Sequence, residues 1–228
     1  MKPTTTDSLH VSLETQPAKP LMRVELDGQN IDLPAQMESS LVAVRAYLEF
    51  LALQQRRVLS GFVVDGVEVR QIQKDAPAGG YRHVCADTIT FEQLSQRLID
   101  TACRQLEYLS ARIEDAALRV VISERHQILA RWREWQPQFR TPLVSLGFLR
   151  ELWGQDVDAI MVGGCSLAEH LEELTPLLCQ VDAVFLATEH GWVDEDAIGL
   201  SIVFEEHLAP WLKMLRVYLL KLNSQPLV

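Results

Sequence analysis

The 228-residue sequence has no run of about 18 apolar residues, the length that a helix needs to cross a bilayer. This absence excludes a conventional membrane-spanning helix. The start of the chain also lacks the apolar run of a secretory signal, because three threonines at positions 4–6 are followed by Asp7. We therefore expect a cytoplasmic protein that does not bind membranes.

Cysteine is sparse and widely spaced. The four cysteines are Cys85, Cys103, Cys165 and Cys179, and no two of them form a C-x-x-C pair. This spacing excludes a zinc knuckle and a thioredoxin-like redox motif, and it predicts free, mostly buried thiols. The sequence also has no His-Glu-x-x-His motif and no complete nucleotide-binding or catalytic motif. We therefore expect no metal ion and no cofactor, and we assign no catalytic residue.

Basic side chains are absent from residues 151–212. The whole chain has 21 basic and 31 acidic residues, and residues 151–228 hold 3 of the basic and 13 of the acidic ones. The remaining residues contain 18 of each sign, so the last third supplies the whole net charge of −10. Such an acidic region repels nucleic acid and anionic lipid, and it favours a basic protein partner.

The acidic third contains candidate residues for partner contact. Glu169, Glu172 and Glu173 are spaced as one charged helical face, and Trp192 and Trp211 are candidate apolar anchors. Glutamate and histidine are neighbours at several points of this region, which raises the question of metal binding. Adjacent side chains point about 100° apart on a helix and cannot easily share one ion. A solvated acidic face is therefore the better interpretation.

Short strands and one helix are predicted after a polar start. Residues 1–20 are polar and contain three prolines, which is typical of a flexible segment. Asp27-Gly28 and Asp65-Gly66 each separate two short segments of strand-like composition, which predicts two β-hairpins. Between the hairpins, residues 40–56 have the apolar spacing of an amphipathic helix, and residues 83–90 are a candidate fifth strand.

This ββαββ order resembles the β-grasp, or ubiquitin-like, arrangement, in which a mixed sheet curls over one helix. The resemblance rests on the order of the elements over about 70 residues, and it implies no functional residue. It implies a small α+β module at residues 21–90.

From Thr90 onward the apolar spacing becomes helical. Thr90 and Gln93 fit a capping box, and neither Pro nor Gly occurs in residues 91–136. An apolar stripe follows, which consists of Leu94, Leu98, Ala102, Leu106, Leu109, Ile113 and Ala117. The stripe fits an internal core or a homodimer interface, and the sequence leaves both open. The expected fold class is α+β, with a β-grasp-like module at 21–90 followed by an all-α helical module at 91–228.

Cys165 is the candidate reactive thiol. It follows Gly163-Gly164 and precedes a predicted helix, whose free N–H groups would lower the pKa of the thiol. His170 lies five residues further on, which corresponds on a helix to about 140° around the axis, so the two side chains are not expected to face each other. A small residue beside a Gly-Gly turn is the commoner explanation.

Two hypotheses about function follow. The first is a non-enzymatic interaction or adaptor protein whose acidic helical surface binds a basic protein partner. The alternative is an enzyme or small-ligand-binding domain with a pocket between the sheet and helical modules, for which Cys165, His170 and His190 are the first residues to test.

Overall fold

The computed structural model describes residues 22–34, 40–72, 80–123, 125–153, 157–186 and 194–224. The chain divides into two compact units at the junction of Ile89 and Thr90. Each unit has its own cluster of buried apolar side chains. The predicted flexible segment at 1–20 lies outside the described residues, as do His190 and Trp192.

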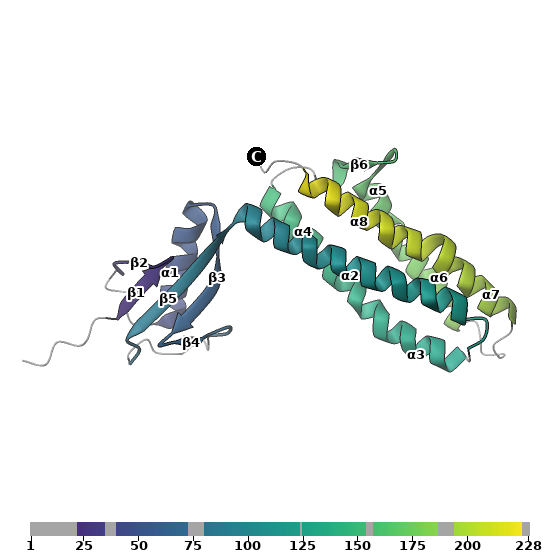
Figure 1. Ribbon diagram of the computed structural model, residues 1–228, viewed down its shortest axis with the longest axis horizontal. Helices are drawn as coiled ribbons and strands as arrows, with labels where there is room; N and C mark the ends of the chain where they lie inside the picture. The colour runs from purple at the N-terminus through teal and green to yellow at the C-terminus, as the bar shows by residue number, and fades with distance from the viewer. Residues whose placement is uncertain are drawn as a thin grey trace, which may run out of the picture. The chain divides into compact units, whose positions relative to one another are not determined.

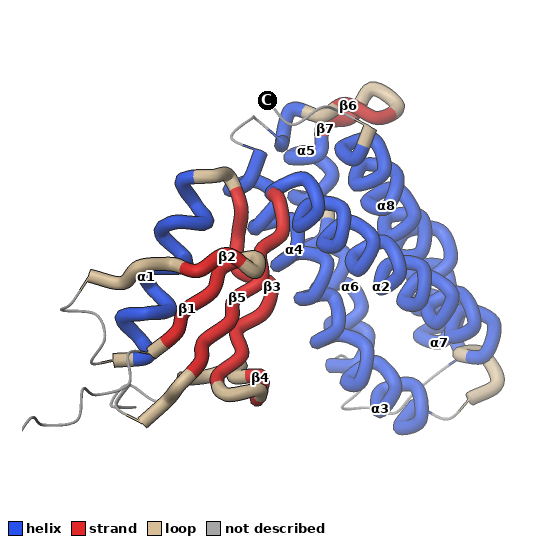
Figure 2. Tube along the Cα trace, turned by 60° about the vertical axis from the view of Figure 1, so that its left-hand side comes forward, coloured by secondary structure: helices blue, strands red, loops and turns tan. Residues whose placement is uncertain are grey.

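The first unit is a five-stranded mixed sheet with one helix (Figures 1 and 2). Its elements in chain order are β1 (Arg23–Leu26), β2 (Gln29–Asn30), α1 (Leu41–Gln54), β3 (Arg57–Val64), β4 (Val67–Glu68) and β5 (His83–Thr90). The strand order across the sheet is β2-β1-β5-β3-β4. The central pair, β1 and β5, is parallel, whereas β1–β2 and β3–β4 are antiparallel hairpins.

Both predicted β-hairpins are confirmed, and the backbone angles of their turns explain why an Asp-Gly pair predicts a hairpin. Asp27 and Gly28 have φ of 50° and 76°, and Asp65 and Gly66 have φ of 48° and 84°. Positive φ at both central residues is the type I′ geometry, which matches the twist of the two strands and favours Asp-Gly. The Asp27 carboxylate also accepts hydrogen bonds from the Thr88 N–H and hydroxyl, which ties the first turn to β5.

The two faces of the sheet differ because side chains alternate along each strand. One face packs against α1 through buried apolar side chains, which are Val24, Leu26, Phe62, Val64, Val84 and Ala86 from the strands and Leu41, Val44 and Leu48 from the helix. The alternate residues of β1 and β5 therefore lie on the opposite face. Glu25, His83 and Cys85 are among them.

The second unit is built around one long helix. Its helices are α2 (Phe91–Arg119), α3 (Arg125–Trp135), α4 (Arg140–Trp153), α5 (Leu167–Glu172), α6 (Leu174–Leu186), α7 (Asp194–Ile202) and α8 (Ala209–Asn223). The predicted capping box is present at the start of α2, where Gln93 N–H donates to the Thr90 hydroxyl and Thr90 N–H donates to the Gln93 side chain. Helices α4 and α8 pack against α2 (Figure 1). Among the described residues, no helix combines the length and apolar character needed to span a bilayer.

The α+β class is confirmed, but the prediction that the second module is entirely helical is wrong. A two-stranded hairpin, β6 (Met161–Val162) and β7 (Cys165–Ser166), precedes α5. Gly163 and Gly164 have φ of 62° and 90°, so this pair forms a tight hairpin turn rather than a simple helix break.

Two prolines shape the helices that follow. Pro176 has no N–H to donate to the carbonyl of Glu172, and α5 ends at that residue before α6 begins. Pro210 likewise cannot donate to the carbonyl of Glu206. The helix widens there into a π-helical turn, Val203–Leu208, in which the Ala209 N–H donates to the Phe204 carbonyl. The chain thus runs from α7 through this π-turn into α8.

Candidate functional site

A cavity of about 560 Å³ opens in the helical unit. Its walls come from the β6–β7 hairpin, α5, α6, the π-turn and α8, and they include Cys165, His170, Glu173 and Trp211. Cavities of roughly 300 to 1,000 Å³ are typical of small-molecule sites. The structure therefore brings together four of the residues that the sequence singled out.

The inner wall of the cavity is a reciprocal contact between α5 and α8. His170 and Trp211 are 5% and 3% exposed, and their rings stack with centroids 4.9 Å apart. The indole N–H of Trp211 donates to the His170 carbonyl at 2.7 Å, and Nε2 of His170 lies 3.0 Å from the Trp211 carbonyl. Because a carbonyl only accepts hydrogen bonds, Nε2 of His170 carries the proton.

Tyr218 ties α8 to the hairpin on the same wall. Its hydroxyl donates to the Cys165 carbonyl at 2.7 Å, and its ring lies beside His170 with centroids 5.2 Å apart. Burial raises the pKa of Tyr218 to about 12, so the phenol stays neutral at physiological pH. The wall thus presents neutral aromatic groups to the cavity.

The rim of the cavity is acidic. Glu173 and Glu206 border it with exposed carboxylates, whereas the described lining includes no Lys or Arg. Lys213 and Arg216 of α8 instead form ion pairs with Glu114 and Glu107 of α2. The described lining therefore offers the rim carboxylates no Lys or Arg, and Nδ1 of His170 lies 3.8 Å from Oε2 of Glu173.

The π-turn supplies Glu206 and His207 to this rim. Such wide turns occur frequently at functional sites, because they displace side chains from the positions that a regular helix would give them. Pro210 follows this turn in the first turn of α8, and the sequence shows the proline, but the π-turn itself was not predicted.

Cys165, the candidate reactive thiol, lies on the β6–β7 hairpin beside the cavity. It lies in β7, before the helix N-cap Ser166, so the angular argument that treated it as part of the helix was wrong. Its thiol donates to the Ser166 carbonyl at 3.4 Å, and the described hydrogen bonds include none between Cys165 and His170.

The three predicted glutamates have different environments. Glu169 belongs to a capping box, and the hydrogen bond from the Ser166 N–H lowers the pKa of its carboxyl. Glu172 is exposed, and Glu173 borders the cavity. Of the two candidate anchors, Trp211 is buried in the cavity wall and Trp192 lies outside the described residues.

The four cysteines are free, as predicted, but the expectation that most are buried is wrong. Cys103 is buried, Cys85 and Cys165 are half-buried and Cys179 is exposed. Cys85 belongs to the one group of described residues with the side chains and spacing to hold a metal ion, together with Glu25 and His83 of the sheet unit. The available sequence signal was His83-x-Cys85, because residues two apart on a strand share a face.

The buried histidine predicts a specific pH dependence of stability. Burial lowers the pKa of His170 below its ordinary value, so the unfolded chain binds this proton more readily than the folded one. The neutral imidazole of His170 therefore stabilises the fold above about pH 6.5, and this stabilisation is lost as the pH falls through the pKa of His170 in the folded protein. Glutamine at this position retains an N–H donor for the Trp211 carbonyl and does not titrate.

We expect the stability gap between wild type and His170→Gln to be largest at pH 8 and to narrow toward pH 5. Urea unfolding followed by circular dichroism at both pH values measures this gap. Carboxylates that titrate equally in both proteins contribute equally to both free energies of unfolding, so their effect cancels in the difference. A gap that stays constant with pH would contradict the assignment of a buried neutral imidazole.

Comparisons of the chain with protein-family models, curated proteins and solved structures found no significant match. The geometry of the described residues is therefore the basis for the proposed function.

Proposed function

We propose that the helical unit binds a small organic cation with an apolar body. The observation that carries this proposal is a cavity with an aromatic inner wall and a rim whose charged lining residues are glutamates. The exposed lining residues Pro176, Pro210 and Met214 offer apolar surface for the body of the ligand, and Glu173 and Glu206 offer carboxylates for its charge. This is the small-ligand alternative, with the pocket placed inside the helical unit.

The two parts of the cavity contribute differently to binding. Apolar surface removed from water contributes about 25 cal/mol per Å², so the exposed apolar lining residues supply most of the affinity. Exposed carboxylates contribute only about 0.2 to 1 kcal/mol each to binding. The rim therefore determines which charge the ligand carries and adds little to the affinity. A cation should therefore bind better than a neutral molecule of the same shape.

A pair of probes tests the proposal directly. We expect phenethylammonium to bind in the cavity and phenethyl alcohol, which has a similar shape and no charge, to bind several-fold more weakly. Chemical-shift changes at Trp211, Tyr218 and Met214 in a ¹H–¹⁵N spectrum report the location, and their concentration dependence gives the affinity. The double variant Glu173→Gln/Glu206→Gln should remove the preference for the cation.

Two further variants separate the cavity from the general surface charge. Met214→Trp places a larger side chain at the cavity border and should block both probes. Glu172→Gln removes an exposed charge outside the lining and should leave binding unchanged. Equal affinity for both probes, or shift changes elsewhere in the protein, would exclude the proposed site.

A basic protein partner is the second candidate. Exposed carboxylates at Glu172, Glu205 and Glu206 and the excess of acidic residues in 151–228 favour this adaptor function. Complementary charge mainly accelerates and selects encounters, so this binding should weaken strongly with salt. A lysine-rich peptide that binds at low salt to wild type and equally to Met214→Trp would support this candidate over the cavity.

For the sheet unit we propose the β-grasp, or ubiquitin-like, fold. Three features support it: the strand order β2-β1-β5-β3-β4, the parallel pairing of β1 with β5, and α1 packed against one face. A cytoplasmic location and a homodimer remain predictions.

A further inference from the structure

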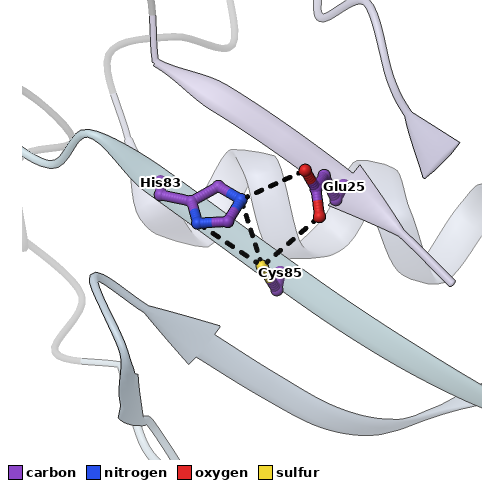
Figure 3. Close-up of side chains that lie close together, drawn as sticks. All are labelled: Glu25, His83 and Cys85. Atoms are coloured by element: carbon purple, nitrogen blue, oxygen red, sulfur yellow. Dashed lines mark hydrogen bonds and ion pairs between the residues drawn. The ribbon is translucent and has the colours of Figure 1, made fainter. Parts of the chain in front are cut away.

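Glu25, His83 and Cys85 gather on the face of the sheet opposite to α1. The parallel register pairs Glu25 with Cys85 and Arg23 with His83, so residues that are 58 positions or more apart in sequence become neighbours. Figure 3 shows the three side chains pointing toward one another from β1 and β5. The Glu25 side chain is 15% exposed and the His83 side chain is 40% exposed, so the group is sheltered but open to solvent.

The spacing of the ligand atoms matches a tetrahedral zinc site. Zinc binds sulfur at about 2.3 Å and nitrogen or oxygen at about 2.0 to 2.2 Å, which places neighbouring ligand atoms about 3.3 to 3.6 Å apart. Nε2 of His83 lies 3.2 Å from Sγ of Cys85 and 3.4 Å from Oε1 of Glu25. Sγ of Cys85 lies 3.8 Å from Oε2 of Glu25. Taking one ligand atom from each residue, all three atoms lie within 4.8 Å of one another, so a small adjustment of the Glu25 carboxylate lets them surround one ion.

We propose that Glu25, His83 and Cys85 form a zinc-binding site on the open face of the sheet. Thiolate and imidazole ligands select zinc over magnesium and calcium, which prefer oxygen ligands. Zinc binding replaces the thiol proton of Cys85, which is released to solvent. Three protein ligands leave the fourth tetrahedral position to water, which is the pattern of zinc sites that bind a further ligand.

Arg23 competes with the ion for Glu25. Its guanidinium lies 2.5 Å from Oε1 of Glu25 and also donates to the Asn30 side chain at 2.9 Å. Since Arg23 is largely exposed, it can move away when a dication binds. Removing its charge should therefore strengthen zinc binding, an effect that a cluster of unrelated surface side chains would not show.

Metal titration of the full chain tests the site. We expect one equivalent of zinc to bind, and Cys85→Ser, His83→Ala and Glu25→Gln each to weaken binding by at least about 100-fold. Arg23→Gln should tighten zinc binding by about two- to five-fold, which corresponds to the free energy that an exposed ion pair contributes. Cys179→Ser, which removes an exposed thiol from the helical unit, is the matched control and should bind zinc like wild type.

Cobalt supplies a readout of the ligands themselves. Bound Co²⁺ should show a thiolate-to-metal charge-transfer band and the intense visible bands of tetrahedral coordination, and Cys85→Ser should lose the charge-transfer band. The substituted side chains lie on the open face, so each apo-variant should unfold at the wild-type temperature, which separates lost binding from lost folding. Undiminished zinc binding by Cys85→Ser, loss of binding in Cys179→Ser, or a cobalt spectrum without the thiolate band would overturn the proposal.

Discussion

Replacing Val44 with aspartate should unfold the sheet unit while the helical unit stays folded. Val44 is 0% exposed in α1 and belongs to the buried cluster that joins this helix to the sheet. An unpaired charge at such a position costs about 4 kcal/mol or more. A single core of this size supplies roughly 3 to 5 kcal/mol in total, so the unit should lose its fold. The helical unit has a separate buried cluster and should therefore stay folded.

A ¹H–¹⁵N spectrum distinguishes the two units residue by residue. We expect the amide signals of the described residues up to Ile89 to collapse to random-coil positions, and those from Thr90 onward to keep their dispersion. Val42→Asp is the matched control, because Val42 lies on the same helix and is 38% exposed. Loss of dispersion in both units of Val44→Asp would show that they fold as one.

The elements that sequence analysis predicted correctly are those fixed by neighbouring residues. Asp27-Gly28 and Asp65-Gly66 set their turns through positive φ, and Thr90 with Gln93 caps a helix through bonds within one turn. Each of these preferences acts over four residues or fewer. The long apolar stripe after Thr90 is equally local, because its period is that of the helix itself.

The features that were missed depend on contacts between distant segments. His83 and Cys85 share a strand face, but only the parallel register of β1 with β5 brings Glu25 beside them. That register follows from how the apolar faces of both strands pack on α1, which no short pattern records. The cavity has the same origin, because Cys165 and His170 precede Trp211 and Tyr218 by more than 40 residues.

Replacing Trp211 with alanine should lower the free energy of unfolding of the helical unit by about 3 to 5 kcal/mol. The substitution removes a buried indole that stacks on His170 and fills the wall between α5 and α8. It also leaves the His170 carbonyl without its 2.7 Å hydrogen bond. Urea unfolding followed by circular dichroism measures the loss, and Met214→Ala, which truncates a half-exposed neighbour on α8, should cost much less.

Replacing Trp211 with phenylalanine distinguishes the contribution of the aromatic ring from that of the indole hydrogen bond. Trp211→Phe keeps an aromatic wall but has no N–H, so it should cost about 1 to 3 kcal/mol, the penalty for an unsatisfied buried carbonyl. It should also still bind phenethylammonium, because the apolar wall and both rim carboxylates remain, whereas Trp211→Ala should bind it at least ten-fold more weakly. Equal binding by both variants would show that the ligand does not contact this wall. Equal stability of both would show that the hydrogen bond, rather than the stacked ring, holds α5 against α8.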